Sequence, residues 1–161
     1  MPTDDLAKAV ERLEELFGKP SEKTLGAAVF LSDTDIESEQ LEGFAKSKYQ
    51  HFAGAAWESI GKENWTKPWK LQYLRPKETS GAILNELRDL QDFSTALAAS
   101  QLTENHDDPE GAAQGLQDVF DSPQIHDVSI YRIGDNDVIT GVLVAGILCT
   151  GKAIALVFLM D

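Results

Sequence analysis

The side chains most often used for metal binding are sparse and widely spaced in this sequence. His51, His106 and His126 lie far apart, and none has a second histidine or a cysteine at the spacing of metal ligands. Cys149 is the only cysteine, so the chain cannot form an internal disulfide, which is typical of a protein from a reducing compartment. We expect no metal site, and we interpret Cys149 as a packing or turn-flanking residue.

The sequence also lacks the motifs that most often carry catalysis. It contains no G-x-S-x-G elbow, no glycine-rich phosphate loop followed by lysine and no dinucleotide-binding fingerprint. We therefore expect a protein that is not an enzyme and that binds no cofactor. A small-molecule enzyme or binder with a pocket between sheet and helices is the alternative.

Two acidic segments have the composition of cation sites but a simpler structural explanation. His106-Asp107-Asp108 precedes Pro109, and a carboxylate there favours the positive end of a helix, so Asp108 is predicted to be a helix N-cap. Gly134-Asp135-Asn136-Asp137 lacks the other alternating ligands and the distal glutamate of a calcium loop. We interpret the second segment as a hairpin turn.

Three aromatic residues, Trp65, Trp69 and Tyr73, recur at intervals of four residues with lysines between them. Such a set can stack bases or anchor a protein interface. The alternative, which we favour, is that these aromatic rings close one edge of the core. Trp65 and Trp69 remain candidate partner-binding residues.

The segment Ser32-Asp33-Thr34-Asp35 follows an apolar run and precedes a predicted helix. Helix capping by one of these side chains is the simpler interpretation. A strand that ends here would also hold two carboxylates at the surface, where they can meet a metal or a cationic cleft of a partner. Ser32, Asp33 and Asp35 are therefore the strongest candidates for a partner-binding site.

The net charge of the chain indicates which class of macromolecule it can bind. The formal net charge is -13, from 27 acidic and 14 basic side chains. Binding to nucleic acid depends on Lys and Arg displacing counterions, so this charge opposes direct nucleic-acid binding. The same surplus favours solubility and attraction to a basic protein surface, and we expect a protein partner.

The distribution of apolar residues argues against membrane contact. Asp4–Phe17 is acidic and helix-like, unlike the basic start and apolar stretch of a signal peptide. The last third is the most apolar part, but Gly141, Gly146 and Gly151 interrupt it, and the stretches between them are too short to span a bilayer. We expect a cytoplasmic protein.

Hydrophobic periodicity and breaker residues predict the elements that position these side chains. Thr3 and Gly18 bound the first helix, while Pro68 and Pro76 flank a strand and confine it to a sheet edge. The predicted elements are a helix over 4–17, a strand over 25–31, short helices over 36–44 and 52–60, an edge strand over 70–74, and helices over 80–102 and 109–120.

The last third of the chain changes character. Three β-rich runs, over 128–133, 138–148 and 153–160, are separated by short turn segments and predict an antiparallel meander of three strands. With the other elements, this predicts one α+β domain over residues 1–161, in which a single mixed or antiparallel sheet is covered by helices.

Two short segments resemble a known family. Phe30-Leu31-Ser32-Asp33-Thr34-Asp35 resembles the Phe-Met-Ser-Glu-Ser-Glu segment of the nuclease A inhibitor family, and an amphipathic helix precedes it in both. Ile130-Tyr131-Arg132-Ile133-Gly134-Asp135 is similar to that family's Val-Tyr-Arg-Val-Gly-Glu. The runs 142–146 and 150–152 then follow at a comparable distance from the C-terminus, so order and rough spacing agree.

This resemblance implies an α/β/α sandwich that inhibits a sugar-nonspecific nuclease. It implies that Asp33 matches the family's metal-directed glutamate, where a carboxylate supplies a hard oxygen ligand to Mg²⁺ in place of a substrate phosphate. The C-terminal Asp161 is a further candidate for the same interface. The leading hypothesis is thus an acidic nuclease inhibitor, and the alternative is a structural or regulatory adaptor that binds a protein through its aromatic edge.

Overall fold

The computed structural model describes residues 4–19, 25–76, 81–135 and 138–160. Its centre is a five-stranded sheet in the order β1-β5-β4-β3-β2, in which every neighbouring pair is antiparallel. The strands are β1 (Gly26–Asp35), β2 (Lys70–Leu74), β3 (Ile125–Gly134), β4 (Thr140–Leu148) and β5 (Lys152–Met160).

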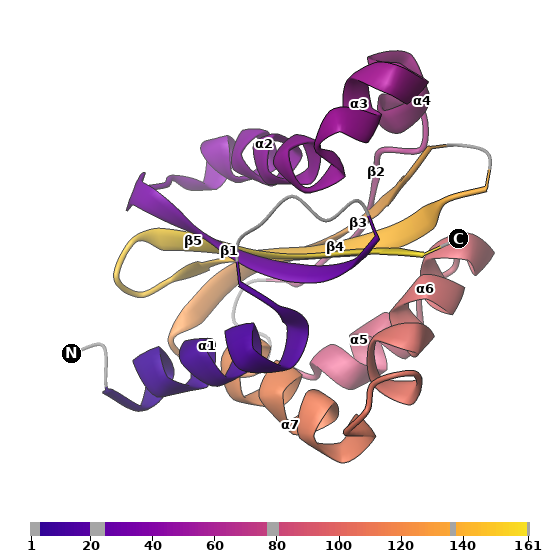
Figure 1. Ribbon diagram of the computed structural model, residues 1–161. Helices are drawn as coiled ribbons and strands as arrows, with labels where there is room; N and C mark the ends of the chain where they lie inside the picture. The colour runs from indigo at the N-terminus through magenta and orange to yellow at the C-terminus, as the bar shows by residue number, and fades with distance from the viewer. Residues whose placement is uncertain (1–3, 20–24, 77–80, 136–137, 161) are drawn as a thin grey trace.

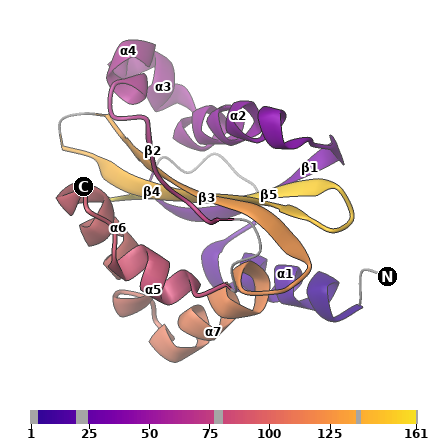
Figure 2. The ribbon, with the colours of Figure 1, turned by 180° about the vertical axis from the view of Figure 1, so that it is seen from behind.

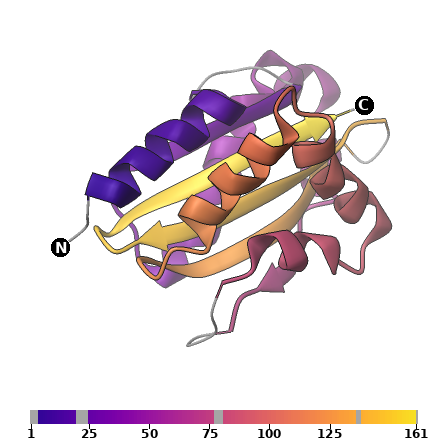
Figure 3. The ribbon, with the colours of Figure 1, turned by 90° about the horizontal axis from the view of Figure 1, so that it is seen from below.

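Helices cover both faces of this sheet, so the protein is an α+β sandwich of three layers (Figure 1). One layer holds the 3-10 helix η1 (Ser38–Gln40) and the helices α2 (Leu41–Ala53), α3 (Ala55–Ile60) and α4 (Lys62–Thr66). The other holds α1 (Asp4–Phe17), α5 (Ile83–Arg88), α6 (Phe93–Glu104) and α7 (Pro109–Phe120). Figure 2 shows the same layers from behind, and Figure 3 shows α1 and α7 side by side along the sheet.

The path of the chain explains this arrangement. After edge strand β1 the chain forms the layer of α2 to α4 and returns as β2 at the opposite edge. It then forms α5 to α7 on the other face, and the meander β3-β4-β5 crosses the sheet back to β1. The predicted meander and the edge position of β2 are both confirmed.

Side chains along the central strands point alternately to the two faces of the sheet, and this produces two separate hydrophobic cores. Val142 and Val144 of β4 pack with α1 and α5 to α7, whereas Leu143 and Ala145 pack with α2 to α4. All four are fully buried. A strand covered on both faces reads as a continuous apolar run, which is why the sequence of β4 carries so few polar residues.

Several predicted helices agree with the structure. The first helix spans Asp4–Phe17 as expected, although its predicted cap Thr3 lies outside the described residues. Helix α7 begins at Pro109, and the carboxylate of Asp108 accepts a hydrogen bond from Gly111 N at 3.1 Å. The predicted N-cap is therefore confirmed.

The predicted continuous helix over 80–102 is wrong, because the segment divides into α5 and α6. Asp92 ends the break as the N-cap of α6, and its carboxylate accepts a hydrogen bond from Thr95 N at 2.9 Å. The same carboxylate pairs with Arg132 of β3 at 3.1 Å. Burial alone would raise the pKa of Asp92, but these hydrogen bonds and Arg132 lower it below its usual value.

Replacing Asp92 with Ala is expected to lower the free energy of unfolding by about 1–2 kcal/mol, because α6 loses its N-cap and its link to β3. Urea unfolding followed by circular dichroism measures this loss. Asp108→Ala at the start of α7 is the matched control, since it removes an N-cap without a partner arginine. An equal loss in both variants would contradict a contribution from Arg132.

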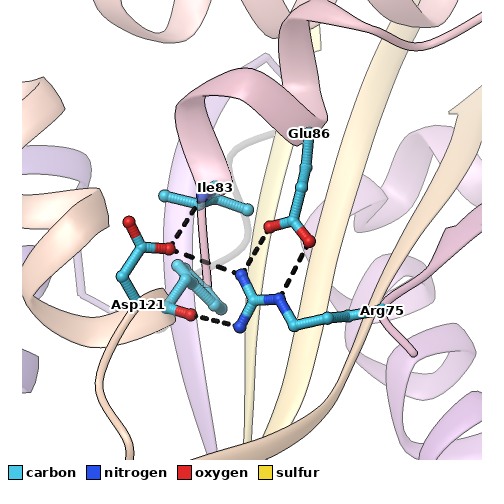
Figure 4. A network of polar contacts seen from close by, with 5 residues as sticks. Arg75, Ile83, Glu86 and Asp121 are labelled. Carbon is cyan, nitrogen blue, oxygen red and sulfur yellow. Dashed lines mark hydrogen bonds and ion pairs between the residues drawn. The ribbon is translucent and has the colours of Figure 1, made fainter. Parts of the chain in front are cut away.

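A polar network closes the sheet edge at β2. Arg75 follows β2 and donates from Nε to Glu86 Oε2 of α5 at 2.9 Å and from Nη1 to Phe120 O of α7 at 2.6 Å (Figure 4). Its Nη2 atom contacts Glu86 and lies 3.4 Å from Asp121 Oδ1. Asp121 in turn accepts a hydrogen bond from Ile83 N at 2.7 Å. One guanidinium thus joins β2, α5 and α7.

Candidate functional site

The end of β1 carries the polar segment singled out in the sequence. The strand does not stop before Ser32 as expected but continues to Asp35, with an irregularity in its pairing to β5 between Leu31 and Asp35. An irregularity of this kind bends an edge strand and leaves residues unpaired. Ser32, Asp33 and Thr34 lie outside the pairing register, whereas Asp35 pairs again with Lys152 of β5.

The buried side chain of Ser32 stabilises the irregular pairing between β1 and β5. Its hydroxyl donates to Thr34 O at 2.6 Å and accepts from Ala153 N at 2.8 Å. Ser32 therefore has a structural role, and its part in partner binding stays a prediction. The expected helix cap is also elsewhere, because Glu37 precedes η1 and forms a capping box with Gln40.

Asp33 lies exposed on the outside of this bend. Its backbone carbonyl accepts a hydrogen bond from Lys152 Nζ at 2.5 Å, which holds the main chain at this corner. Within the described part of the chain, no hydrogen bond or ion pair engages the Asp33 carboxylate. Its two oxygens are thus available to a partner.

Asp35 has a different environment. It pairs with Lys152 in the register of β1 and β5, and its carboxyl group lies against the β4–β5 turn. A Cβ atom at position 151 would lie 2.8 Å from Asp35 Cγ, and Gly151 has a φ of +97°. Only glycine suits both the turn and the nearby carboxylate.

Further acidic side chains surround this corner. Ile36 N donates to Gly151 O at 2.8 Å, which brings the start of η1 beside the β4–β5 turn. Ser38 donates to the carboxylate of Asp127 at the start of β3. We call this surface the acidic end of the sheet, and it comprises Asp33, Asp35, Glu37, Glu39 and Asp127.

The acidic end is the left end of the sheet in Figure 1, where β1 stops and β4 turns into β5. Lys152 is the basic side chain that the structure places at this corner. Carboxylates here outnumber their local counter-charge, so the surface attracts cations and basic proteins.

Asp127 is partly covered and has an unusual backbone conformation. Its φ is +57°, and one carboxylate oxygen, Oδ2, contacts both Ser38 Oγ and His126 Nδ1. In a catalytic triad the imidazole takes the proton of the serine, whereas here Ser38 bonds directly to the carboxylate. The group therefore fixes η1 to β3 and does not have the geometry of a nucleophile and its base.

The two candidate tryptophans lie at the opposite part of the molecule. Trp65 is fully buried, donates to Ala56 O at 3.1 Å and stacks on Trp57. Its prediction as a partner-binding residue is wrong, because no ring surface remains to contact a partner. Trp69 is half-buried and stacks on Tyr131 with ring centroids 4.6 Å apart. These aromatic rings close an edge of the core, as we favoured.

The remaining candidate features are simple to place. Among the described residues, no group of three or more His, Cys, Asp or Glu side chains could hold a metal ion. The same part of the chain contains no helix that is long and apolar enough to cross a membrane. Cys149 lies exposed in the β4–β5 turn. Asp161 lies outside the described residues.

Comparison with protein-family models, curated proteins and solved structures gives no match for this chain. The resemblance to the nuclease A inhibitor family therefore stays a prediction. The function must be argued from the geometry of the acidic end.

Sequence reasoning missed one part of this region. Glu11 and Glu14 of α1 line a groove that also contains Leu31 and Ser32, beside the acidic end. Residues three apart share one side of a helix, so the spacing of the two glutamates was a usable signal. The sequence did not show which strand lies beside that side of the helix.

Proposed function

We propose that this protein binds a basic protein partner through the acidic end of the sheet. In the specific form of the proposal, the partner is a sugar-nonspecific nuclease, and the protein inhibits it by presenting carboxylates to its metal-containing cleft. One observation carries the proposal: the Asp33 carboxylate is exposed at the Ser32 bend, and no donor from the described ranges of the chain engages it.

The electrostatics of such an enzyme fit this surface. A nuclease that binds a polyanion must present positive potential around its cleft, so an acidic inhibitor gains association rate and specificity from complementary charge. Mg²⁺ prefers oxygen ligands, and it is commonly held by only one or two carboxylates. A carboxylate at a rigid corner can therefore take the place of a substrate phosphate oxygen.

Asp33 and Asp35 have different roles in this proposal. Asp33 is the metal-directed group, because its carboxylate makes no hydrogen bond or ion pair with the residues that the structure describes. Asp35 lies against Gly151 and opposite Lys152, so it contributes charge to the rim of the interface. The neighbouring acidic side chains add to the attraction without reaching the metal.

Asp33→Asn is expected to raise the inhibition constant for a basic, Mg²⁺-dependent nuclease by about 30-fold or more, equivalent to about 2 kcal/mol. The amide keeps the size of the side chain and removes its charge. Nuclease assays at two salt concentrations measure the inhibition constant. Inhibition by the wild-type protein should become weaker as the salt concentration rises.

Glu58→Gln is the matched control, since Glu58 is exposed on α3 and lies outside the acidic end. It should leave the inhibition constant unchanged. If Asp33→Asn inhibits as strongly as the wild type, Asp33 has no metal-directed role. If no basic nuclease is inhibited by the wild type, the specific form of the proposal fails.

A second candidate function rests on a different surface. Leu71 and Leu74 of edge strand β2 are 43% and 53% exposed, next to the half-buried Trp69. An apolar sheet edge of this kind suits an adaptor that binds a protein partner. Loss of partner capture by Trp69→Ala with the fold intact, and its retention by Asp33→Asn, would favour the adaptor.

A further inference from the structure

A groove of about 490 Å³ runs between α1 and the β1 edge of the sheet. Its walls are mainly apolar, with Leu6 and Val10 from α1 and Leu31 and Leu148 from the strands. Leu31 is 36% exposed, so its side chain is accessible from the groove. The groove opens at the β4–β5 turn, beside the acidic end.

The charges of α1 are divided between its two sides. Glu11 and Glu14 line this groove, whereas Lys8 and Arg12 line a separate groove next to α7. Burial raises the pKa of Glu14, and repulsion from Glu11 raises it further, while Lys19 lowers it in part. Lys152 also lines the groove and offsets one of these two carboxylates, so the charged side chains of the groove remain negative in sum.

The outer edge of β1 is open beside this groove. Val29 N donates to Gly18 O at 3.0 Å, so the backbone groups of Val29 point away from β5. Backbone groups alternate along a strand, and those of Leu31 therefore point to the same outer side. Within the described residues, Gly18 covers Val29, and no backbone hydrogen bond from outside the sheet reaches Leu31.

We infer that this groove receives an apolar side chain from a basic, extended segment of the protein partner, which pairs with the outer edge of β1 at Leu31. The inference rests on the proposed function, because it takes the partner to be a basic protein that meets the acidic end. The apolar walls favour an apolar side chain in the bound segment, and the open strand edge favours an extended backbone. Glu11 and Glu14 favour a segment with positive charge.

A second copy of this chain does not fit the groove as well. Each copy carries a net charge of -13, so two copies repel, and the acidic groove walls add to this repulsion. A basic segment instead gains from Glu11, Glu14 and the acidic end at the same time. Strand addition at an edge also supplies backbone hydrogen bonds that do not depend on the sequence of the partner.

The test uses the synthetic peptide acetyl-Lys-Val-Lys-Leu-Lys-Val-Lys-amide as the probe. Titration into the ¹⁵N-labelled protein should shift the amide signals of Val10, Leu31 and Thr150, and the Kd follows from the curve. A matched peptide with Asn in place of Val and Leu should bind roughly 10-fold more weakly or worse, because it has no large apolar side chain to bury in the groove.

Two variants of the protein test the groove from its own side. Ala7→Trp fills the groove from the exposed side of α1 and should raise the Kd of the basic peptide at least 10-fold, whereas Ala55→Trp on exposed α3 should not. The double variant Glu11→Gln and Glu14→Gln should weaken binding and reduce its salt dependence. If the tryptophan of Ala7→Trp disturbs the packing of α1, the double glutamine variant decides whether the groove binds the peptide.

The outcomes separate this inference from the proposed function. Equal affinity of the two peptides, or an unchanged Kd in both groove variants, overturns the groove site, while loss of nuclease inhibition in Asp33→Asn would still support the proposed function. Failure to inhibit any basic nuclease defeats the nuclease-inhibiting form of the proposed function, and the peptide titration still decides whether the groove binds basic segments.

Discussion

Replacing Arg75 with Met is expected to lower the free energy of unfolding by about 3–5 kcal/mol, because two carboxylates lose their shared cation. The side chains of Arg75 and Glu86 are only 8% and 9% exposed, so water cannot replace the lost contacts (Figure 4). The backbone carbonyl of Phe120 loses its donor as well. Urea unfolding monitored by circular dichroism measures the difference.

Arg88→Met is the control for this variant. Arg88 is an exposed arginine at the end of α5, and its contact with Asn85 is at the 3.5 Å limit of a hydrogen bond. Its replacement should change the free energy of unfolding by less than about 0.5 kcal/mol. Similar losses in the two variants would show that the buried network adds nothing beyond an ordinary surface arginine.

The same network predicts a pH dependence. Burial alone would raise the pKa of Glu86, but the hydrogen bonds and charge of Arg75 lower it below the usual 4.5. A group with a lowered pKa in the folded state stabilises the fold above its unfolded value and loses that contribution as the pH falls. The stability difference between wild type and Glu86→Gln should therefore shrink as the pH falls below about 4.5.

Asp121 acts in the opposite direction within this network. Burial raises its pKa despite the hydrogen bond from Ile83 and the charge of Arg75, and the nearby Glu86 raises it further. Its contribution is present at low pH and is lost as the pH rises through the raised pKa. Asp121→Asn should therefore reduce stability less at neutral pH than Glu86→Gln does.

Tyr49→Phe is expected to lower the free energy of unfolding by about 2–4 kcal/mol. The buried hydroxyl of Tyr49 contacts Gly134 O at 2.7 Å and Trp65 O at 2.9 Å and accepts a hydrogen bond from Gly134 N at 3.0 Å. Phenylalanine would leave these buried backbone groups without their partner. Burial raises the pKa of Tyr49 well above its usual value, so the hydroxyl remains a donor at all working pH values.

Tyr131→Phe provides the comparison for that variant. Tyr131 is also buried, but its hydroxyl interacts with the side chain of Ser129, whose own hydroxyl donates to Asp127 O. Tyr131→Phe should lower the free energy of unfolding by about 1 kcal/mol. Chemical denaturation of both variants would contradict the proposed role of Tyr49 if Tyr131→Phe were the more damaging change.

The parts of the fold that depend on neighbouring residues were predictable. Asp108 followed by Pro109 contains the whole signal for the start of α7, and flanking prolines confined β2 to an edge. The break between α5 and α6 was not predictable in this way, because apolar residues continue at helical spacing through Leu90 and Phe93. Phe93 is 79% exposed, and Asp92, the N-cap of α6, also pairs with Arg132, which lies 40 residues further along the chain.

In the candidate site, too, the features set by neighbouring residues were predictable and those set by distant contacts were not. The exposure of Asp33 and Asp35 follows from a polar segment after an apolar run, and it was predicted. The burial of Ser32 depends on Ala153, which is 121 residues further along the chain. The groove likewise depends on α1 lying next to β1, and no local pattern specifies that contact.

The arrangement of aromatic residues determines what an optical experiment on this protein can detect. Trp57, Trp65 and Trp69 are its three tryptophans, and all of them pack with Tyr49 in the layer of α2 to α4. Tryptophan emission therefore reports directly on that layer and is blind to melting of α1 and α5 to α7. An unfolding curve from fluorescence alone would miss a state in which only one side of the sheet has lost its helices, and agreement with the far-ultraviolet signal is the measure of whether the two sides unfold together.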